Sequence, residues 1–369
     1  MVPDVKDTCI FMGLTECIDK EGSSVGLTSS NPGSCSGAPL VTVVCHAYNH
    51  ASYIAETLDS ILSQRTTFEF EILVHDDASI DGTREIVQRY LSRYPGRIRA
   101  IMQSENQYSK GIRPSFYTFR DIKGKYFAFC EGDDCWTSRN KLHAQVSCLE
   151  EMPGVDFCFH PAIRLDVSSG RKKKFCDYGG HQRLFTVEDV LKKRAQFAPS
   201  SSYLIRASSL SRYPKFFFDS PSLPYGDFFI ECFSGANGLI YLPEFMSIYR
   251  RNVPGSHTSR MKVREASDLL ENMEVSLGFV ERMSDYIPVS KASIRTRMEL
   301  VRMDYGIRFF VGKNYHAYRD AVSGVKIHGW RQLVFMFVSA SPLIFHVARL
   351  LFGAFASIKS GFHRSGDPR

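Results

Sequence analysis

Residues 126–136 read YFAFCEGDDCW, an apolar run typical of a buried strand that ends in a cluster of carboxylates. Glu131, Asp133 and Asp134 lie within four residues of one another. Such a cluster is costly because like charges repel unless a cation or solvent offsets them. Hard divalent cations, such as Mg2+ and Mn2+, take oxygen ligands of this kind. The alternative from these residues alone is a solvated acidic turn that begins the next helix.

The chain before this stretch alternates between strand and helix patterns. Strand-like runs at 40–45, 70–74 and 98–102 are separated by stretches with helical apolar spacing. This alternation predicts parallel strands joined by right-handed helical crossovers. The carboxyl ends of parallel strands share one edge of the sheet, and open sheets bind ligands there. The polar residues expected to meet at that edge are His46, Tyr48, Asp76, Asp77, Glu131 and Asp133.

In combination, these motifs resemble the nucleotide-sugar half of the family 2 glycosyltransferases, which have the GT-A fold. The resemblance rests on Tyr48-Asn49, on DDASIDGT at 76–83, on KGKY at 123–126 and on the acidic motif. It covers about residues 40–255, more loosely after 160. It implies an α/β fold, with a Rossmann-like, mostly parallel sheet flanked by helices, here followed by a C-terminal helical appendage. It also implies inverting sugar transfer from a nucleotide sugar, with a UDP-sugar as the first expectation.

The resemblance places four residues at the nucleotide. Asp77 matches the family carboxylate that hydrogen-bonds the pyrimidine base, and Asp76 lies beside it. His46 and Tyr48 match positions that flank this base. From the residues alone, the aspartates also suit turn formation, and Tyr48 also suits packing at the sheet edge.

The acidic motif corresponds to the Asp-x-Asp motif of the family. Its first position here is Glu131, one methylene longer than the usual Asp. We expect Glu131 near the ribose or a metal-bound water. Asp133, at the third position, matches the metal ligand, which implies Mn2+ or Mg2+ as the cofactor. The cation would bridge the donor diphosphate and offset the charge of the leaving group.

A further acidic residue, Asp227, opens the apolar helical run at 225–231. Stabilising a helix N-terminus is a sufficient structural reason for an Asp. In the family, however, a carboxylate at the start of the helix after the acceptor loop is the general base, and Asp227 matches it. It would take the proton from the acceptor hydroxyl as that oxygen attacks the anomeric carbon. Glu231, one turn later, is the alternative base.

The segment at 250–257 is the last candidate part of the site. In the family a loop here folds over the donor diphosphate, so Arg250, Arg251 and His257 are candidate phosphate contacts. A surface loop is the alternative. The chain has no Gln-x-x-Arg-Trp motif, which the processive synthases of the family carry. We therefore expect single-sugar transfer to a glycan or lipid-linked acceptor in surface polysaccharide synthesis.

Composition and pattern divide the chain into four segments. They are a disordered segment at 1–38, a glycosyltransferase domain at 39–258 with halves at 39–136 and 137–258, a helical appendage at 259–329, and an apolar and basic tail at 330–369. A hairpin is expected over 163–175, with its turn at 168–170. The ten cysteines show no paired spacing and no secretory signal precedes them, so we expect reduced thiols and a cytoplasmic protein.

The tail at 330–369 suggests contact with a membrane surface. Pro342, His346 and Arg349 interrupt it, so it has no unbroken apolar span of about 20 residues. Aromatic, apolar and basic residues in this mixture suit helices that lie in a membrane interface, here on the inner face of the cytoplasmic membrane. Packing on protein or oligomerisation is the alternative. The net charge of +7 is modest, and the basic residues are not interleaved with aromatic residues in a motif. We therefore expect no nucleic acid as a partner.

Two other functions share parts of this pattern. Sugar nucleotidyltransferases have a similar architecture but carry a Gly-rich phosphate loop after the first strand, and residues 46–50 contain no glycine. A non-catalytic, membrane-peripheral nucleotide-binding module would not need the carboxylates. Nucleotide binding that is insensitive to metal and to Asp133→Ala would favour this module.

Overall fold

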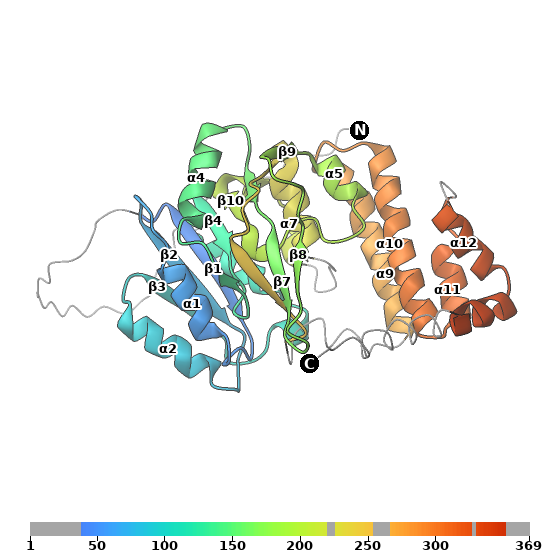
Figure 1. The fold of residues 1–369 in the computed structure, drawn as a ribbon, viewed down its shortest axis with the longest axis horizontal. Coiled ribbons are helices and arrows are strands. Elements are labelled where there is room, and N and C mark those ends of the chain that lie inside the picture. The colour runs from blue at the N-terminus through green and yellow to red at the C-terminus, as the bar shows by residue number, and fades with distance from the viewer. Residues whose placement is uncertain (1–37, 220–225, 254–265, 327–329, 352–369) are drawn as a thin grey trace, which may run out of the picture.

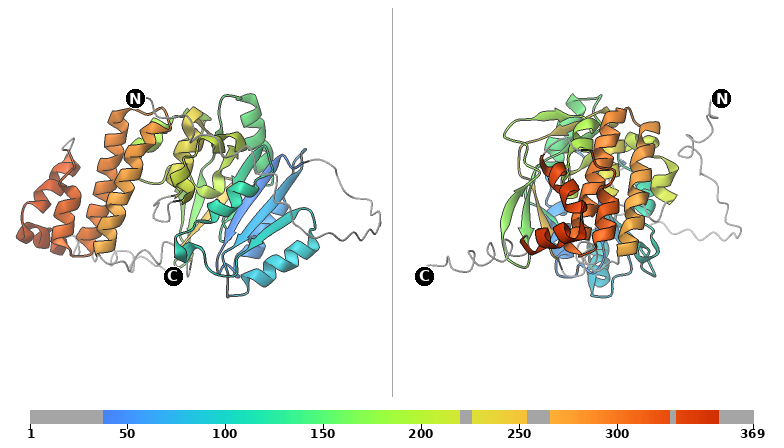
Figure 2. Two further views of the ribbon diagram at one scale, coloured as in Figure 1. Left: turned by 180° about the vertical axis from the view of Figure 1, so that it is seen from behind. Right: turned by 90° about the vertical axis from the view of Figure 1, so that its right-hand side faces the viewer.

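The computed structural model describes residues 38–219, 226–253, 266–326 and 330–351. These residues form a part that contains two sheets and, at one end of the long axis, a stack of helices (Figure 1). Figure 2 shows the same arrangement from behind and from the helical end. The segment that we expect to be disordered, 1–38, lies outside the described residues except for its last residue.

The larger sheet contains eight of the described strands. In spatial order they are β3 (Ile98–Met102), β2 (Phe70–Asp76), β1 (Val41–Ala47), β4 (Tyr126–Phe129), β10 (Leu204–Arg206), β6 (Phe157–Phe159), β11 (Leu239–Tyr241) and β9 (Arg183–Phe185). The strands from β3 to β4 are parallel to one another, as are β6 and β11, whereas β10 and β9 run antiparallel to their neighbours. The predicted α/β class with a mostly parallel sheet is confirmed.

The smaller sheet lies beside the acidic motif. Its described strands, in spatial order, are β5 (Cys135–Trp136), β12 (Ser247–Arg251), β7 (Ala162–Asp166) and β8 (Lys172–Phe175). β7 and β8 form the predicted hairpin, and Gly170 in its turn has a φ of 66°. β12 pairs with β5, which directly follows the acidic motif. This pairing brings residues 247–251 to the candidate site.

Helices flank the larger sheet. They are α1 (Ile54–Leu62), α2 (Thr83–Arg93), α3 (Pro114–Thr118), α4 (Lys141–Glu151), α5 (Val187–Lys192), α6 (Lys215–Asp219) and α7 (Gly226–Ser234). The central strands are buried on both faces: Phe127 and Phe129 of β4 belong to one apolar cluster, and Tyr126 and Ala128 belong to another. Burial on both sides explains why these strands read as continuous apolar runs.

The appendage is a stack of helices that follows the sheets. Its helices are α9 (Ala266–Arg282), α10 (Lys291–Val311), α11 (Tyr315–Val322) and α12 (Trp330–Ser339), with a further helical segment at 342–351. Val280 and Met283 join the core of the sheet-containing part, whereas α11 and α12 contribute to a separate apolar core. Arg194 pairs with Asp304 of α10 over 2.7 Å. The appendage therefore packs against the sheet-containing part beside α5.

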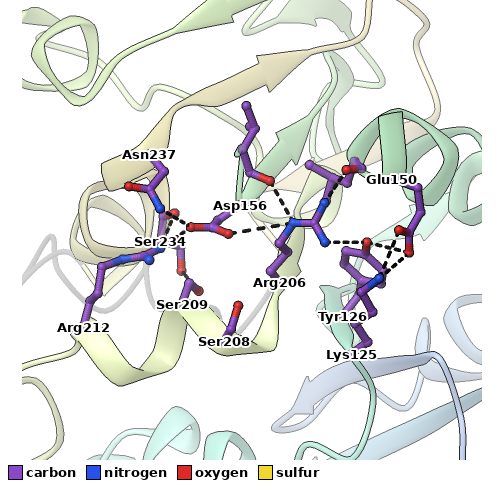
Figure 3. Close-up of polar contacts among 12 residues, drawn as sticks. Lys125, Tyr126, Glu150, Asp156, Arg206, Ser208, Ser209, Arg212, Ser234 and Asn237 are labelled. Carbon is purple, nitrogen blue, oxygen red and sulfur yellow. Dashed lines mark hydrogen bonds and ion pairs between the residues drawn. The ribbon is translucent and has the colours of Figure 1, made fainter. Parts of the chain in front are cut away.

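A buried polar network lies at the start of β4, away from the acidic motif (Figure 3). Arg206 Nε lies 3.8 Å from a carboxylate oxygen of Asp156, and Arg212 Nη2 donates to the other oxygen over 2.6 Å. Arg212 Nε also donates to the carbonyl oxygen of Phe233, in the last turn of α7. Buried charges are tolerated when hydrogen bonds satisfy them. The network thus fixes one end of α7, and Asp227 lies at the other end.

Candidate active site

The acidic motif forms a tight loop at the end of β4. The backbone N–H of Gly132 donates to the carbonyl oxygen of His46 over 2.8 Å. The hydroxyl of Thr57, on α1, donates to the carbonyl oxygen of Asp134 over 2.7 Å. A Cβ atom at residue 132 would lie 2.8 Å from Nδ1 of His50, so a larger residue at this position would displace the histidine ring. The loop is therefore held by α1 and by the end of β1.

Two histidines, His46 near the end of β1 and His50 just after it, face the carboxylates. Nδ1 of His46 lies 3.5 Å from Oε1 of Glu131, and Nε2 of His46 is hydrogen-bonded to Thr118 Oγ1 over 3.1 Å. Nε2 of His50 lies 3.8 Å from Oδ2 of Asp133. The structure thus brings His46, Glu131 and Asp133 together. Sequence reasoning did not select His50, because a lone histidine in a loop carries no ligand or catalytic spacing.

Burial and charge repulsion raise the pKa values of the two aspartates of the motif. Desolvation and the charge of Glu131 raise the pKa of Asp133, against a lowering by His50. Desolvation and the charge of Asp133 raise the pKa of Asp134 well above its ordinary value. Oδ2 of Asp134 is buried and has no hydrogen-bond partner among the described residues. A divalent cation would offset this accumulation of negative charge.

The residues present suit a Mg2+ or Mn2+ ion that the substrate helps to hold. Among the described residues, no three His, Cys, Asp or Glu side chains converge as a complete metal site. Ions of this class often use one or two carboxylates and take their other ligands from substrate phosphates and water. Asp134 is 1% exposed and accepts a hydrogen bond from the backbone N–H of Arg250. Asp133 is the more accessible carboxylate and stays the predicted ligand.

The carboxylates after β2 hold the segments around them. Asp77 accepts backbone N–H bonds from Gln107 over 2.8 Å and from Tyr108 over 3.1 Å, one on each oxygen. Each of these oxygens keeps another lone pair for a ligand N–H. Anchoring of the segment and binding of a base are therefore compatible at Asp77. Asp76 is fully buried and lies 3.5 Å from Nε of Arg84, an arrangement that serves the fold.

The segments after β1 and β2 are tied together. Asn49 has a φ of 56° and donates its backbone N–H to Ser79 Oγ over 2.9 Å. Its side-chain oxygen accepts from the backbone N–H of Ile80 over 2.9 Å. Tyr48 lies beside Asn49 and is half-buried. These bonds explain why the Tyr48-Asn49 motif and the motif at 76–83 occur together.

Asp227 is the first acidic residue of α7 and is exposed to solvent. Even so, desolvation by the surrounding protein and the negative charge of Glu131 raise its pKa to about 6, while Arg113 and His46 oppose the rise. Asp227 therefore shares one electrostatic environment with the acidic motif. A carboxylate whose pKa is near neutral suits a general base.

The structure speaks against Glu231 as the alternative base. Its side chain is 2% exposed and accepts hydrogen bonds from the backbone N–H of Ala198 over 2.9 Å and from the hydroxyl of Tyr203 over 2.8 Å. Desolvation raises its pKa to about 8, so Glu231 is largely uncharged at neutral pH. It supports α7 from inside the core.

The candidate phosphate contacts have different positions. Arg250 is 8% exposed: its Nη1 donates to the carbonyl oxygen of Asp133 over 2.9 Å, and its Nη2 donates to Glu56 over 2.6 Å. Its guanidinium thus supports the acidic motif. Arg251 is exposed at the end of β12. His257 lies outside the described residues.

Arg113 is a candidate site residue that sequence reasoning missed. A Cβ atom at residue 226 would lie 2.6 Å from Nη1 of Arg113, so the guanidinium occupies the space beside the first residue of α7. Desolvation lowers its pKa, while Tyr108 and Asp227 oppose this change. Among the described residues, no side chain forms a hydrogen bond or an ion pair with this guanidinium. No motif marks Arg113, because its proximity to Gly226 depends on the tertiary fold.

Comparisons with known proteins show similarity to glycosyltransferases. A family model described as "Glycosyl transferase family 2" matches residues 42–213. An uncharacterised protein of Mycobacterium tuberculosis strain H37Rv is 32% identical over 234 residues, which are 61% of this chain and 64% of that protein. The match thus spans less than two thirds of that relative. An uncharacterised glycosyltransferase of Nostoc sp. PCC 7120 is 25% identical over 334 residues, which are 85% of this chain and 94% of that protein.

A shorter match and two solved structures add detail. One match is TuaG of Bacillus subtilis, which is provisionally named as a teichuronic acid biosynthesis glycosyltransferase. It is 34% identical over 113 residues, which are 31% of this chain and 43% of that protein. The 1–349 fragment of S. aureus TarS has a TM-score of 0.57 at 15% identity, over 89% of this chain and 93% of that one. Its complex with UDP-GlcNAc has a TM-score of 0.55 at 17% identity, over 84% and 87%. This likeness establishes the predicted GT-A fold.

Proposed function

We propose that this chain, whose residues 42–213 match the model of glycosyl transferase family 2, transfers a single sugar from a nucleotide sugar to an acceptor hydroxyl with inversion. The observation that carries the proposal is the common environment of two acidic groups. The acidic motif follows β4, Asp227 begins α7, and the charge of Glu131 contributes to the raised pKa of Asp227. The acidic motif would bind the departing diphosphate through a cation, and Asp227 would accept the proton of the attacking hydroxyl.

The donor binds along the edge formed by β1, β2 and β4. The base lies against His46 and Tyr48, and Asp77 accepts a hydrogen bond from it with a free lone pair. Asp76, the neighbour of Asp77 in the chain, is paired with Arg84 over 3.5 Å and serves the fold. A UDP-sugar is the expected donor, and the UDP-GlcNAc bound by the TarS fragment supports this choice.

The diphosphate lies next to the acidic motif. When bound at Asp133, Mn2+ or Mg2+ neutralises charge on the leaving diphosphate. Glu131 lies toward the ribose, where His46 holds its carboxylate at 3.5 Å. Arg113 adds a positive charge between the donor half and α7, because its guanidinium lies beside Gly226 without a protein partner among the described residues. Arg251, exposed at the end of β12, and His257 stay candidate phosphate contacts.

Asp227 is the general base. It takes the proton from the acceptor hydroxyl while the acceptor oxygen forms its bond to the anomeric carbon. The bond from that carbon to the diphosphate oxygen breaks, and the nucleoside diphosphate leaves with the electron pair. Attack from the face opposite the leaving group inverts the anomeric configuration. The buried ends of α7 and β10, held by Asp156 and Arg212, keep this helix in place.

The acceptor is a glycan or a lipid-linked glycan in surface polysaccharide synthesis. The provisional role in the name of TuaG, a relative over 31% of this chain, supports this class. An enzyme that modifies a lipid-linked acceptor works at a membrane surface, which here is the inner face of the cytoplasmic membrane.

The proposal is tested by measuring nucleoside diphosphate release from a panel of UDP-, GDP-, dTDP- and CDP-sugars. No glycan acceptor is added, so water acts as the acceptor. We expect slow, metal-dependent release from one nucleotide class by the wild type and none by Asp227→Asn. A nucleotidyltransferase would instead form pyrophosphate from a nucleoside triphosphate and a sugar phosphate. Pyrophosphate formation, or no release from any donor, would contradict the proposal.

A further inference from the structure

We propose that the outer end of the appendage, formed by α12 and the helical segment 342–351, binds the surface of an anionic lipid bilayer. This surface is called the apolar end below. The inference concerns where the chain is held and does not depend on the transfer reaction.

The apolar end exposes an unusual amount of apolar side chain. Seven of the twelve exposed large apolar side chains in the described residues lie between 333 and 351, with exposed fractions of 48–72%. Leu333 and Phe337 are one turn apart on α12, and Leu343 and Leu350 are two turns apart in the next helix. This spacing places the exposed apolar side chains of each helix along one face, where they form a continuous stripe. Exposed apolar surface of this extent marks an interaction site.

The opposite faces of these helices are packed against the rest of the appendage. Phe345 is fully buried and contacts the rings of Phe310, Tyr315 and Tyr318 at centroid distances of 5.2–5.6 Å. The hydroxyl of Tyr318 donates to the carbonyl oxygen of Phe335 on α12 over 2.9 Å. One face of these helices is therefore packed against the appendage, and the exposed apolar stripes lie on the opposite face.

Charge favours a lipid surface over a second copy of the chain. Residues 330–351, which form the apolar end, contain two Arg, Arg331 and Arg349, and no Asp or Glu. Anionic headgroups attract such a segment. Two copies that met through the same basic region would repel each other. An exposed apolar surface whose sequence carries basic and no acidic residues therefore fits an anionic bilayer.

The helices are suited to lie in the plane of the interface. None of the described helices combines the length and the apolarity needed to cross a membrane. α12 has 10 residues and is therefore about 15 Å long. Amphipathic helices that bury one apolar face among the headgroups bind in this way. Such binding would hold the sheet-containing part close to a lipid-linked acceptor.

The test uses the full chain and sedimentation with vesicles of phosphatidylcholine, with and without phosphatidylglycerol. We expect the wild type to sediment with the anionic vesicles and to be released by high salt. The double variant Leu343→Gln, Leu350→Gln should lose at least tenfold in vesicle partition. Leu184→Gln is the matched control, because Leu184 is a 52% exposed apolar residue on β9. It should bind vesicles like the wild type.

Two further readouts keep the result unambiguous. Circular dichroism and nucleotide binding, measured on the same preparations, separate loss of membrane contact from loss of folding or of the nucleotide site. The inference is overturned if the wild type ignores anionic vesicles, or if the double variant sediments with them as the wild type does. Sedimentation velocity that shows a dimer abolished by the double variant would overturn it in favour of a second copy.

Discussion

Arg250 supports the acidic motif directly: its Nη1 donates a hydrogen bond to the carbonyl oxygen of Asp133 over 2.9 Å. Arg250 lies on β12 of the smaller sheet, and Asp133 follows β4 of the larger one. Nη2 of the same guanidinium pairs with Glu56 on α1. One side chain thus joins β12, α1 and the acidic motif next to the predicted metal ligand, whereas the sequence analysis named it as a candidate phosphate contact.

Arg250→Met should therefore damage both stability and the motif. The substitution leaves the Asp133 carbonyl unpaired, so we expect the free energy of unfolding to fall by about 1–3 kcal/mol. Metal-dependent nucleotide binding should weaken as well. Arg251→Gln is the matched control on the same strand, and its stability should stay within about 0.5 kcal/mol of the wild type. Urea denaturation and calorimetry measure both effects, and an unchanged Arg250→Met protein would refute this role.

Asp227→Asn should abolish transfer and leave donor binding intact. Loss of a general base typically lowers kcat by about 10²–10⁴-fold. Glu231→Gln is the control one helical turn away: Glu231 is largely uncharged at neutral pH, and the amide oxygen can accept its two hydrogen bonds. Glu231→Gln should therefore keep most activity. Equal loss of activity in the two variants would go against the assignment of the base.

The pH dependence of the reaction should report the ionisation of Asp227. Only the ionised carboxylate can accept a proton, so activity falls as the pH drops through its pKa. Because that pKa is raised to about 6, the decline should begin near pH 6, well above the ordinary range of Asp. The acid limb of kcat/KM measures it. A profile that stays flat down to pH 5 would contradict a base with this pKa.

Replacing Arg113 should shift the acid limb of the same pH profile. Its positive charge opposes the rise in the pKa of Asp227, so Arg113→Gln should move the limb to higher pH. Arg113→Lys keeps the charge and should leave the limb nearly in place. Donor KM, measured alongside, shows whether the guanidinium also binds phosphate. If neither the limb nor KM differs between the Gln variant and the wild type, Arg113 has no part in the site.

Local pattern predicted much of the sheet. Apolar runs at 40–45 and 70–74 identified β1 and β2, because a strand buried on both faces is mostly apolar. The run at 98–102 identified β3, an edge strand that is only partly buried. No sequence pattern predicted that β10 would lie between β4 and β6 and run antiparallel to both. Which strands pair across a long separation depends on tertiary packing, and strand pattern alone does not encode it.

The site shows the same division. The sequence analysis selected the carboxylates Glu131, Asp133 and Asp227 from short local motifs and the family resemblance. The partners that decide their chemistry were not: Arg250 is 117 residues from Asp133, and Arg113 meets Gly226 only through the fold. Short motifs identify reactive groups, whereas the residues that orient them are brought together by distant elements.

The central claim is that Asp133 and a divalent cation hold the diphosphate of a nucleotide donor. Calorimetric titration of UDP, GDP, dTDP and CDP into the wild type and Asp133→Ala, with Mn2+ and then with chelator, tests it most directly. We predict that one nucleotide binds the wild type with Mn2+, and that chelator and Asp133→Ala each weaken this binding at least tenfold. Binding that ignores both changes, or no binding of any of the four nucleotides, would contradict the claim.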